Sequence, residues 1–191
     1  MYNRYYLTKP LTNCLQSIWC KEGPILLQKE CDIGEDYTLG DLYTKKLFPL
    51  GVDAMIEVVE LVKKKQLTKR EQVLSEGSYE SWFRNEAVLL DFTMNVNSVY
   101  NIIRAANPTP GAVVRHAGNS IKFYDSRKVE DKGQEPGMIV EVSGEGLLVQ
   151  AKGGCILVKR VELSDGRRLH ASELTSEAGF DVGSVFDSQI V

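Results

Sequence analysis

The chain has 191 residues, of which 43% are hydrophobic and 26% charged, and this composition is typical of a folded globular protein. It excludes collagen-like and disordered chains. The 23 basic and 26 acidic side chains give a net charge of −3, which is too near neutral to indicate nucleic-acid binding from overall charge. The length allows one large domain or two small ones.

The sequence shows no membrane-spanning or secretory segment. No apolar run approaches the roughly 20 residues of a spanning helix, so we expect a cytoplasmic protein without membrane contact. The four cysteines are spaced irregularly and follow no zinc-site or dithiol pattern, so we expect reduced thiols and no metal site. They are Cys14, Cys20, Cys31 and Cys155.

The first half of the chain predicts a strand followed by a helix. Polarity alternates roughly from residue 25 to 33, which indicates a strand that ends at Gly34. Thr38 and Asp41 form a variant capping box, which predicts a helix that begins at Leu39. Pro49 and Gly51 interrupt it, so residues 39–65 form one broken helix or two abutting ones.

The second of these helical segments carries an apolar stripe. We interpret the stripe as core contact, because apolar residues at helical spacing usually pack against the protein interior. Without a sheet to cover it, the stripe would have to pack elsewhere in the chain, self-associate or lie in a poorly ordered segment. Its residues are Val52, Met55, Ile56, Val59 and Val62.

A linker and a short helix come next. Residues 66–85 lack periodicity, and we assign 67–95 to a linker. Asn97 can cap a helix whose Val99 and Ile103 lie on one apolar side and which ends at Asn107, before a proline.

The rest of the chain is rich in strand signals. Five runs separated by turn residues predict a compact Greek-key antiparallel barrel, with a helical turn over 171–177 and fraying beyond Val185. The runs cover residues 112–116, 121–126, 138–142, 147–151 and 156–163.

Basic side chains are concentrated in this second half. The net charge is −1 over residues 1–110, +2 over 111–170 and −4 over 171–191. These cations form either a phosphate-contacting surface or an ordinary solvated face with interleaved acids. The candidates are Arg115, Lys122, Arg127, Lys128, Lys159, Arg160, Arg167 and Arg168.

Several segments, in order along the chain, resemble the 10-formyltetrahydrofolate-dependent formyltransferase family. The resemblance is greatest to methionyl-tRNA formyltransferases and to the hydrolase domain of 10-formyltetrahydrofolate dehydrogenase. It runs from Gly23-Pro-Ile-Leu-Leu through Ile102-Ile-Arg-Ala-Ala-Asn-Pro-Thr-Pro-Gly to Ala171-Ser-Glu-Leu. It implies an α+β chain: a partial α/β catalytic domain over 1–66, with 1–22 unlike the family, and an OB-like barrel with its leading helix over 96–186.

The resemblance also implies a chemistry and a deficit. Family members transfer a formyl group from 10-formyltetrahydrofolate to an amine, such as that of methionyl-tRNA, and so take part in one-carbon metabolism and translation initiation. The resemblance implies that the catalytic residues of the family are those of an Asn-x-His motif together with an Asp. No Asn-x-His is found here, and Lys21 stands where the Asp is expected. We therefore assign no catalytic residue and no folate-binding residue.

Three interpretations follow. The chain is a formyltransferase-type protein that is inactive alone, a non-catalytic module that binds tRNA or another protein, or a truncated or rearranged product. His116 and His170 belong to no recognisable catalytic motif, and we interpret both as surface or turn residues. The helix between Val52 and Val62 is the candidate surface for self-association.

Overall fold

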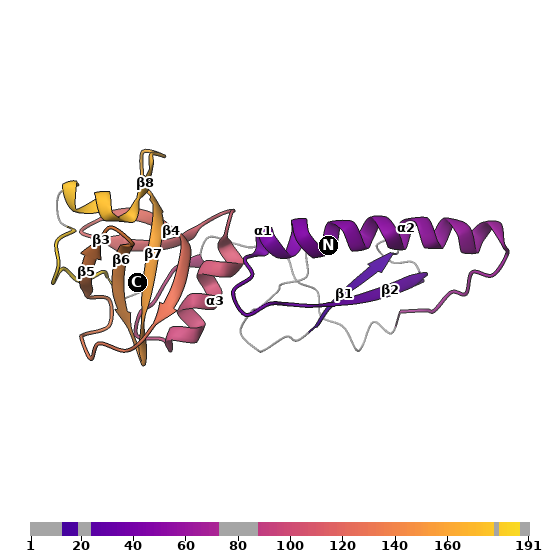
Figure 1. Cartoon of the computed structure of the whole chain (residues 1–191), viewed down its shortest axis with the longest axis horizontal. Coiled ribbons are helices and arrows are strands. Elements are labelled where there is room, and N and C mark those ends of the chain that lie inside the picture. The colour runs from indigo at the N-terminus through magenta and orange to yellow at the C-terminus, as the bar shows by residue number, and fades with distance from the viewer. Residues whose placement is uncertain (1–12, 19–23, 73–87, 178–179, 188–191) are drawn as a thin grey trace. The chain divides into compact units, whose positions relative to one another are not determined.

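The computed structural model describes residues 13–18, 24–72, 88–177 and 180–187 (Figure 1). The chain divides into two compact units. The described part of the N-terminal unit lies within residues 13–72, and that of the C-terminal unit within 88–187. Each unit is described by itself. The position of Lys21 lies outside the described residues.

The N-terminal unit combines a hairpin with a long helical segment. Strand β1 (Asn13–Ile18) pairs antiparallel with β2 (Leu27–Asp32). The sequence predicts β2 to within two residues, whereas β1 was not predicted. Helix α1 (Leu39–Leu42), the π-helical turn η1 (Tyr43–Leu47) and α2 (Phe48–Lys63) then follow one another without a break.

The predicted start of this helical segment is confirmed, whereas the predicted interruption at Pro49 and Gly51 is wrong, because both residues lie inside α2. The Thr38 hydroxyl accepts a hydrogen bond from the Asp41 backbone N–H at 3.1 Å, and the Asp41 carboxylate accepts one from the Thr38 N–H at 3.2 Å. Pro49 follows the π-helical turn directly, so its missing N–H falls where the helical hydrogen-bond pattern changes from π to α. The wider π-helical turn before it joins the two abutting helices.

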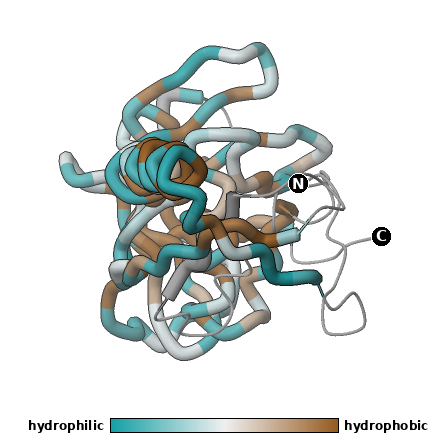
Figure 2. Tube along the Cα trace, turned by 90° about the vertical axis from the view of Figure 1, so that its right-hand side faces the viewer, coloured by the Kyte–Doolittle hydropathy of each residue, from teal (hydrophilic) through white to brown (hydrophobic). Residues whose placement is uncertain are grey.

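Helix α2 has two apolar sides. Leu47, Ala54 and Val58 are buried, and α2 contacts both strands of the hairpin. A second row of large apolar side chains is 44–59% exposed, so the interpretation of this row as core contact is wrong. We call it the α2 stripe: Phe48, Val52, Met55, Ile56, Val59 and Val62. Figure 2, which views α2 nearly along its axis, shows a brown apolar side and a teal polar side.

The C-terminal unit begins with a helix and continues as a sheet. Helix α3 (Val96–Ala106) starts at Asn95, whose side chain accepts a hydrogen bond from the Asn97 N–H at 2.9 Å. The predicted cap at Asn97 was therefore two residues late. After α3 come the elements β3 (Ala112–His116), β4 (Asn119–Val129), β5 (Ile139–Ser143), β6 (Gly146–Ala151), β7 (Gly154–Glu162), β8 (Arg168–His170) and the 3-10 helix η4 (Ala171–Ser176).

The five predicted strands correspond to β3 to β7, and β8 is an addition. The strand order is β3-β4-β7-β6-β5, every neighbouring pair is antiparallel, and β8 also pairs with β7. Strands β5, β6 and β7 follow one another as neighbours, and β7 returns beside β4, which is a Greek-key order. The end strands β3 and β5 are not paired with each other, so a closed OB-like barrel is not confirmed.

A segment near the C-terminus bridges the two end strands. The Asp187 N–H donates to the Arg115 carbonyl of β3 at 2.9 Å, and the Phe186 N–H donates to Gly137, just before β5, at 2.9 Å. We call residues 183–187 the C-terminal strap. Phe186 is only 1% exposed, so the prediction of fraying beyond Val185 is wrong for this residue.

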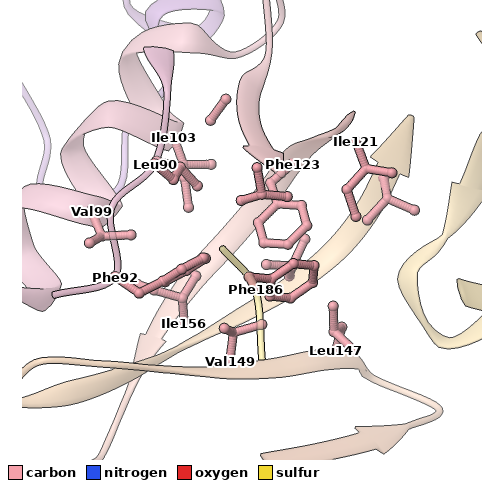
Figure 3. Close-up of a cluster of buried hydrophobic side chains, with 14 of the residues drawn as sticks. Leu90, Phe92, Val99, Ile103, Ile121, Phe123, Leu147, Val149, Ile156 and Phe186 are labelled. Carbon is pink, nitrogen blue, oxygen red and sulfur yellow. The ribbon is translucent and has the colours of Figure 1, made fainter. Parts of the chain in front are cut away.

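The core of this unit lies between α3 and the sheet. Figure 3 shows Val99 and Ile103 of α3 on one side of the cluster, Phe123 and Ile156 from the strands, and Phe186 of the strap among them. Three further core residues precede α3 and fall inside the predicted linker 67–95, which did not anticipate their burial. They are Val88, Leu90 and Phe92.

Candidate nucleic-acid interface

Polar side chains from neighbouring strands meet on one outward face of the sheet. Lys122 of β4 lies opposite Glu162 of β7, and Glu162 lies opposite Arg168 of β8. Two residues further along β4, Tyr124 lies opposite Arg160 of β7. Because side chains alternate between the two sides of a strand, these residues share one face.

The residues that alternate with these polar side chains point to the opposite side of the sheet, into the core. Phe123 and Val161 are buried in the core and alternate with the polar residues of β4 and β7. In β3, Val114 is buried in the same way, so alternation turns Arg115 to the outward face beside β4. We call the four basic residues of this surface the cationic face: Arg115, Lys122, Arg160 and Arg168.

Glu162 organises the centre of the cationic face. Its carboxylate accepts hydrogen bonds from Lys122 Nζ at 2.8 Å and from Arg168 Nε at 2.7 Å. The hydrogen bond from Lys122, together with that from Arg168, holds the pKa of Glu162 below its usual value. The same bond raises the pKa of Lys122. Both cations are therefore held in fixed positions by one partly buried carboxylate.

Tyr124 supports two of the cations from beneath. It is 1% exposed, and the guanidinium carbons of Arg160 and Arg168 lie 5.7 Å and 5.2 Å from its ring centroid. Burial raises the pKa of its hydroxyl. Cation–π attraction thus adds to the ion pairs in orienting both guanidinium groups. The backbone of Gly111, with φ of +89°, lies against the Tyr124 phenol, where no larger residue fits.

The two long strands change sides at the edge of this face. Asp125 has a φ of +45°, and beyond it Val158 and Ile156 of β7 point into the core, at positions whose spacing from Val161 breaks the alternation. Asp125 accepts a hydrogen bond from Asn107 Nδ2 at 3.0 Å and pairs with Arg160 at 3.0 Å. The distortion in β4 ends the cationic face.

The remaining four predicted cations lie elsewhere. Arg127 pairs with Glu145 at 2.5 Å, beyond the point where the strands change sides. Lys128 reaches the Asn97 side chain of α3 at 2.9 Å. Arg167 is held in the turn before β8 by Asp165 and Glu177. Lys159 lies between Val158 and Arg160, where β7 exchanges its inward and outward sides. The structure therefore brings together four of the eight predicted residues, not all of them.

The net charge of the cationic face is positive. Its four basic residues are offset by three acids, Glu162, Asp125 and Asp187, the last of which lies opposite Arg115, and this leaves an excess of one positive charge. Arg115 contributes without an ion-pair partner among the residues that the structure describes. A flat, prearranged set of guanidinium and ammonium groups is suited to contacting phosphates.

The two histidines have structural contacts. His116 lies between Phe180 and Phe186, with ring centroids 5.0 Å and 5.7 Å away, and its Nδ1 is 3.0 Å from the Val185 carbonyl oxygen. His170 caps η4 through Ser172, at 2.7 Å. His170 is exposed, as the interpretation as a surface or turn residue predicts, whereas His116 is half-buried at the end of β3.

The part of the chain that the structure describes was searched for metal-ligand clusters and for membrane-spanning helices. Among the residues described, no three side chains of His, Cys, Asp or Glu come together as metal ligands. Cys155 is buried, and burial raises the pKa of its thiol. None of the described helices is long and apolar enough to span a membrane.

Comparison with known proteins identifies the family. The model of the formyl transferase C-terminal domain matches residues 84–179, which is half of the chain. The chain belongs to the formyltransferase family. This match covers α3 and the whole of the sheet that carries the cationic face.

Individual formyltransferases and related enzymes match over a longer stretch. The chain is 28% identical to a methionyl-tRNA formyltransferase of Natranaerobius thermophilus over 167 residues, 85% of this chain and 52% of the relative. It is 29% identical to the cytosolic 10-formyltetrahydrofolate dehydrogenase of Mus musculus over 161 residues, 79% of this chain and 18% of that protein. The chain thus spans about half the length of the methionyl-tRNA formyltransferases it matches.

Solved structures share the fold. HypX from Aquifex aeolicus superposes with a TM-score of 0.70 at 14% identity, over 82% of this chain and 29% of HypX. The N-formyltransferase from Helicobacter canadensis superposes with a TM-score of 0.60 at 18% identity, over 78% of this chain and 56% of that enzyme. At these identities the likeness concerns the fold alone.

Proposed function

We propose that this chain serves formyl transfer from 10-formyltetrahydrofolate to an amine, with methionyl-tRNA as the acceptor. The observation that carries the proposal is the similarity to a methionyl-tRNA formyltransferase over 85% of the chain. Use of the folate donor is supported by the 10-formyltetrahydrofolate dehydrogenase relative and by a structure of HypX with tetrahydrofolic acid, whose TM-score is 0.65. The cytoplasmic location expected from the sequence stays a prediction.

The chain by itself is proposed to be inactive. Formyl transfer needs groups that stabilise an oxyanion and accept a proton from the attacking amine. The sequence contains no Asn-x-His motif, and the contacts of His116 and His170 leave them in structural roles. The catalytic groups would have to come from other residues or from another polypeptide.

An assay of formyl transfer tests this part of the proposal. The purified chain is mixed with 10-formyltetrahydrofolate and methionyl-tRNA, and formylmethionyl-tRNA is measured against buffer and against a complete methionyl-tRNA formyltransferase. We expect formation at the rate of the buffer control. Turnover clearly above that rate would show that this chain carries catalytic groups of its own.

A second function is supported by the cationic face. As a non-catalytic docking module, the C-terminal unit would hold tRNA phosphates against Arg115, Lys122, Arg160 and Arg168. Lys122, Arg160 and Arg168 are held by Glu162, Asp125 and Tyr124 before any ligand arrives, which lowers the entropy cost of binding. Phosphate contacts of this kind fix the position of the RNA rather than read its sequence.

Filter binding of tRNA at a series of salt concentrations tests the docking function. Because each phosphate contact releases counterions, we expect log K to fall with log salt with a slope of about −2 to −4. Binding that does not respond to salt, or no binding at 50–200 mM salt, would rule the docking function out. Binding without turnover would support docking while leaving the donor chemistry to other residues.

A further inference from the structure

Arg168 is oriented by two contacts that act in different directions. Its Nε donates to the Glu162 carboxylate at 2.7 Å, and its guanidinium carbon lies 5.2 Å from the centroid of the Tyr124 ring. The hydrogen bond fixes which edge of the guanidinium points inward, and the ring contact restricts the tilt of its plane. Both partners are firmly placed, since the side chain of Glu162 is 12% exposed and Tyr124 is 1% exposed. Arg168 therefore has a defined orientation although its own side chain is 52% exposed.

The inner edge of the Arg168 guanidinium is used by the fold, and its outer end is left for a ligand. The hydrogen bond to Glu162 occupies the N–H of Nε and leaves the N–H groups of Nη1 and Nη2 out of this ion pair. Two parallel N–H groups at this end match two oxygens of one phosphate group. Arg168 can thus bind a phosphate through two hydrogen bonds while it keeps its contact with Glu162.

Lys122 is held on the same carboxylate as Arg168. Its Nζ donates to Glu162 Oε1 at 2.8 Å, while Arg168 Nε donates to Oε2 at 2.7 Å. The hydrogen bond from Lys122, followed by that from Arg168, lowers the pKa of Glu162, so the carboxylate stays charged at neutral pH and both contacts persist. A phosphate that binds the outer end of Arg168 therefore has a second positive charge beside it.

Arg160 differs from Arg168, although both guanidinium groups lie against the ring of Tyr124. Its terminal nitrogen Nη2 pairs with the Asp125 carboxylate at 3.0 Å, and its Nε is buried. The end that would bind a phosphate through two hydrogen bonds is therefore already engaged by Asp125. Arg160 contributes positive charge to the cationic face, whereas Arg168 contributes both charge and direction.

We propose that Arg168 anchors the RNA: its Nη1 and Nη2 bind two oxygens of one phosphate, Lys122 supplies the adjacent charge, and Glu162 positions both cations. This assignment rests on the proposed docking function and deepens it, because it gives one of the phosphate contacts a fixed direction. A guanidinium that is already oriented loses little conformational freedom on binding. Charge alone would make the cations of the face interchangeable, whereas orientation makes Arg168 irreplaceable even by lysine.

Charge-conserving substitutions in the full chain test the anchor. Arg168→Lys keeps the positive charge but lacks both the planar group that lies against Tyr124 and the two parallel donors. We expect the dissociation constant for tRNA at fixed salt to rise about fivefold to tenfold. The slope of log K against log salt should stay the same, because no charge is lost.

Arg115→Lys is the matched control for this substitution. Within the described residues Arg115 has no ion pair and no ring contact, so nothing orients its guanidinium. Lysine should therefore replace it with no change in the dissociation constant or in the salt slope. Circular dichroism checks that both variants are folded under the conditions of the binding assay.

Glu162→Gln tests the positioning role separately. The substitution makes the cationic face more positive, so charge alone predicts tighter binding of tRNA. If Glu162 positions Lys122 and Arg168, binding weakens instead, and we expect about a threefold rise in the dissociation constant. Glu145→Gln makes the same change in charge at an exposed ion pair outside the face, and it should not weaken binding. Urea unfolding confirms that Glu162→Gln is folded at the pH of the assay.

The possible results distinguish the anchor from the docking function itself. No binding of tRNA by the native chain in the salt series would overturn both. Binding by the native chain with equal affinities of Arg168→Lys and Arg115→Lys would leave docking intact and overturn the anchor. Tighter or unchanged binding of Glu162→Gln would overturn the positioning role of Glu162 in the same way.

Discussion

Arg160 and Asp125 pair across β7 and β4 at 3.0 Å, at the point where both strands exchange their inward and outward sides. The pair thus joins the edge of the cationic face to a backbone distortion that few residues tolerate, since Asp125 has a φ of +45°. Asp125 also binds Asn107, so the segment that connects α3 to β3 is held at the same place.

Neutral variants of the cationic face should weaken tRNA binding one contact at a time. Arg115→Gln and Arg168→Gln are each expected to reduce the magnitude of the salt slope by about 1 and to lower affinity alike for all tRNA sequences. Arg127→Gln is the matched control, because Arg127 lies beyond the crossover and pairs with Glu145. An equal effect of Arg127→Gln would contradict the assignment of the face.

Glu162 should make stability depend on pH in the acid range. Hydrogen bonds from Lys122 and Arg168 lower the pKa of its carboxyl in the folded state, so the charged form stabilises the fold. The stabilisation by charged Glu162 is fully present above pH 4.5, the ordinary pKa of the carboxyl. It is lost as the pH falls through the lower pKa that the carboxyl has in the folded protein.

Urea unfolding at several pH values measures this contribution. Glu162→Gln should lower the free energy of unfolding at pH 7 by about 1–2 kcal/mol, because the Glu162 side chain is only 12% exposed and its carboxylate accepts charged hydrogen bonds. The difference between the variant and the native chain should shrink as the pH falls through the lowered pKa of Glu162. Glu145→Gln, at an exposed ion pair, should change little at either pH.

Gly111 should tolerate no side chain. Its φ is +89°, and a Cβ atom would overlap the Tyr124 hydroxyl and ring. Gly111→Ala is expected to cost about 3 kcal/mol or more, combining backbone strain with displacement of a packed tyrosine. Gly118→Ala provides the comparison, since Gly118 has a φ of +81° but nothing within 4 Å. Gly118→Ala should cost about 1–2 kcal/mol. Equal losses of stability in the two variants would show that overlap with Tyr124 contributes nothing.

The strap should be essential for the C-terminal unit. Phe186 contacts the rings of Phe92, Phe123 and His116, with centroids 5.5–5.8 Å apart. Phe186→Ala is expected to lower the free energy of unfolding by about 3–5 kcal/mol in urea titrations. Val182→Ala, four residues earlier and 61% exposed, should have almost no effect. A small loss at Phe186 would mean that the strap is not part of the core.

The strands of the C-terminal unit were predictable because their signal is local. Alternating polarity and turn residues lie within each run, as between His116 and Asn119, and need no knowledge of distant partners. The strap was missed because a run of five residues carries no periodic pattern. Their burial depends on two end strands that are far away in the sequence.

The sequence could not show which of the basic residues share one face of the sheet. In the sequence they occur as adjacent pairs, such as Lys159 with Arg160 and Arg167 with Arg168. Neighbouring residues of a strand point to opposite sides, so only one member of such a pair can belong to a given face. The α2 stripe is similar, since periodicity identifies an apolar side but not what covers it.

The strap also has a consequence for the order of folding during synthesis. Strands β3 and β5 leave the ribosome well before residues 183–187, which supply the hydrogen bonds at the outer edge of β3 and beside the start of β5. Until residue 187 has emerged, two strand edges remain open and Phe186 is missing from the core. Chains that lack residues 183–187 are therefore the species we expect chaperones to bind.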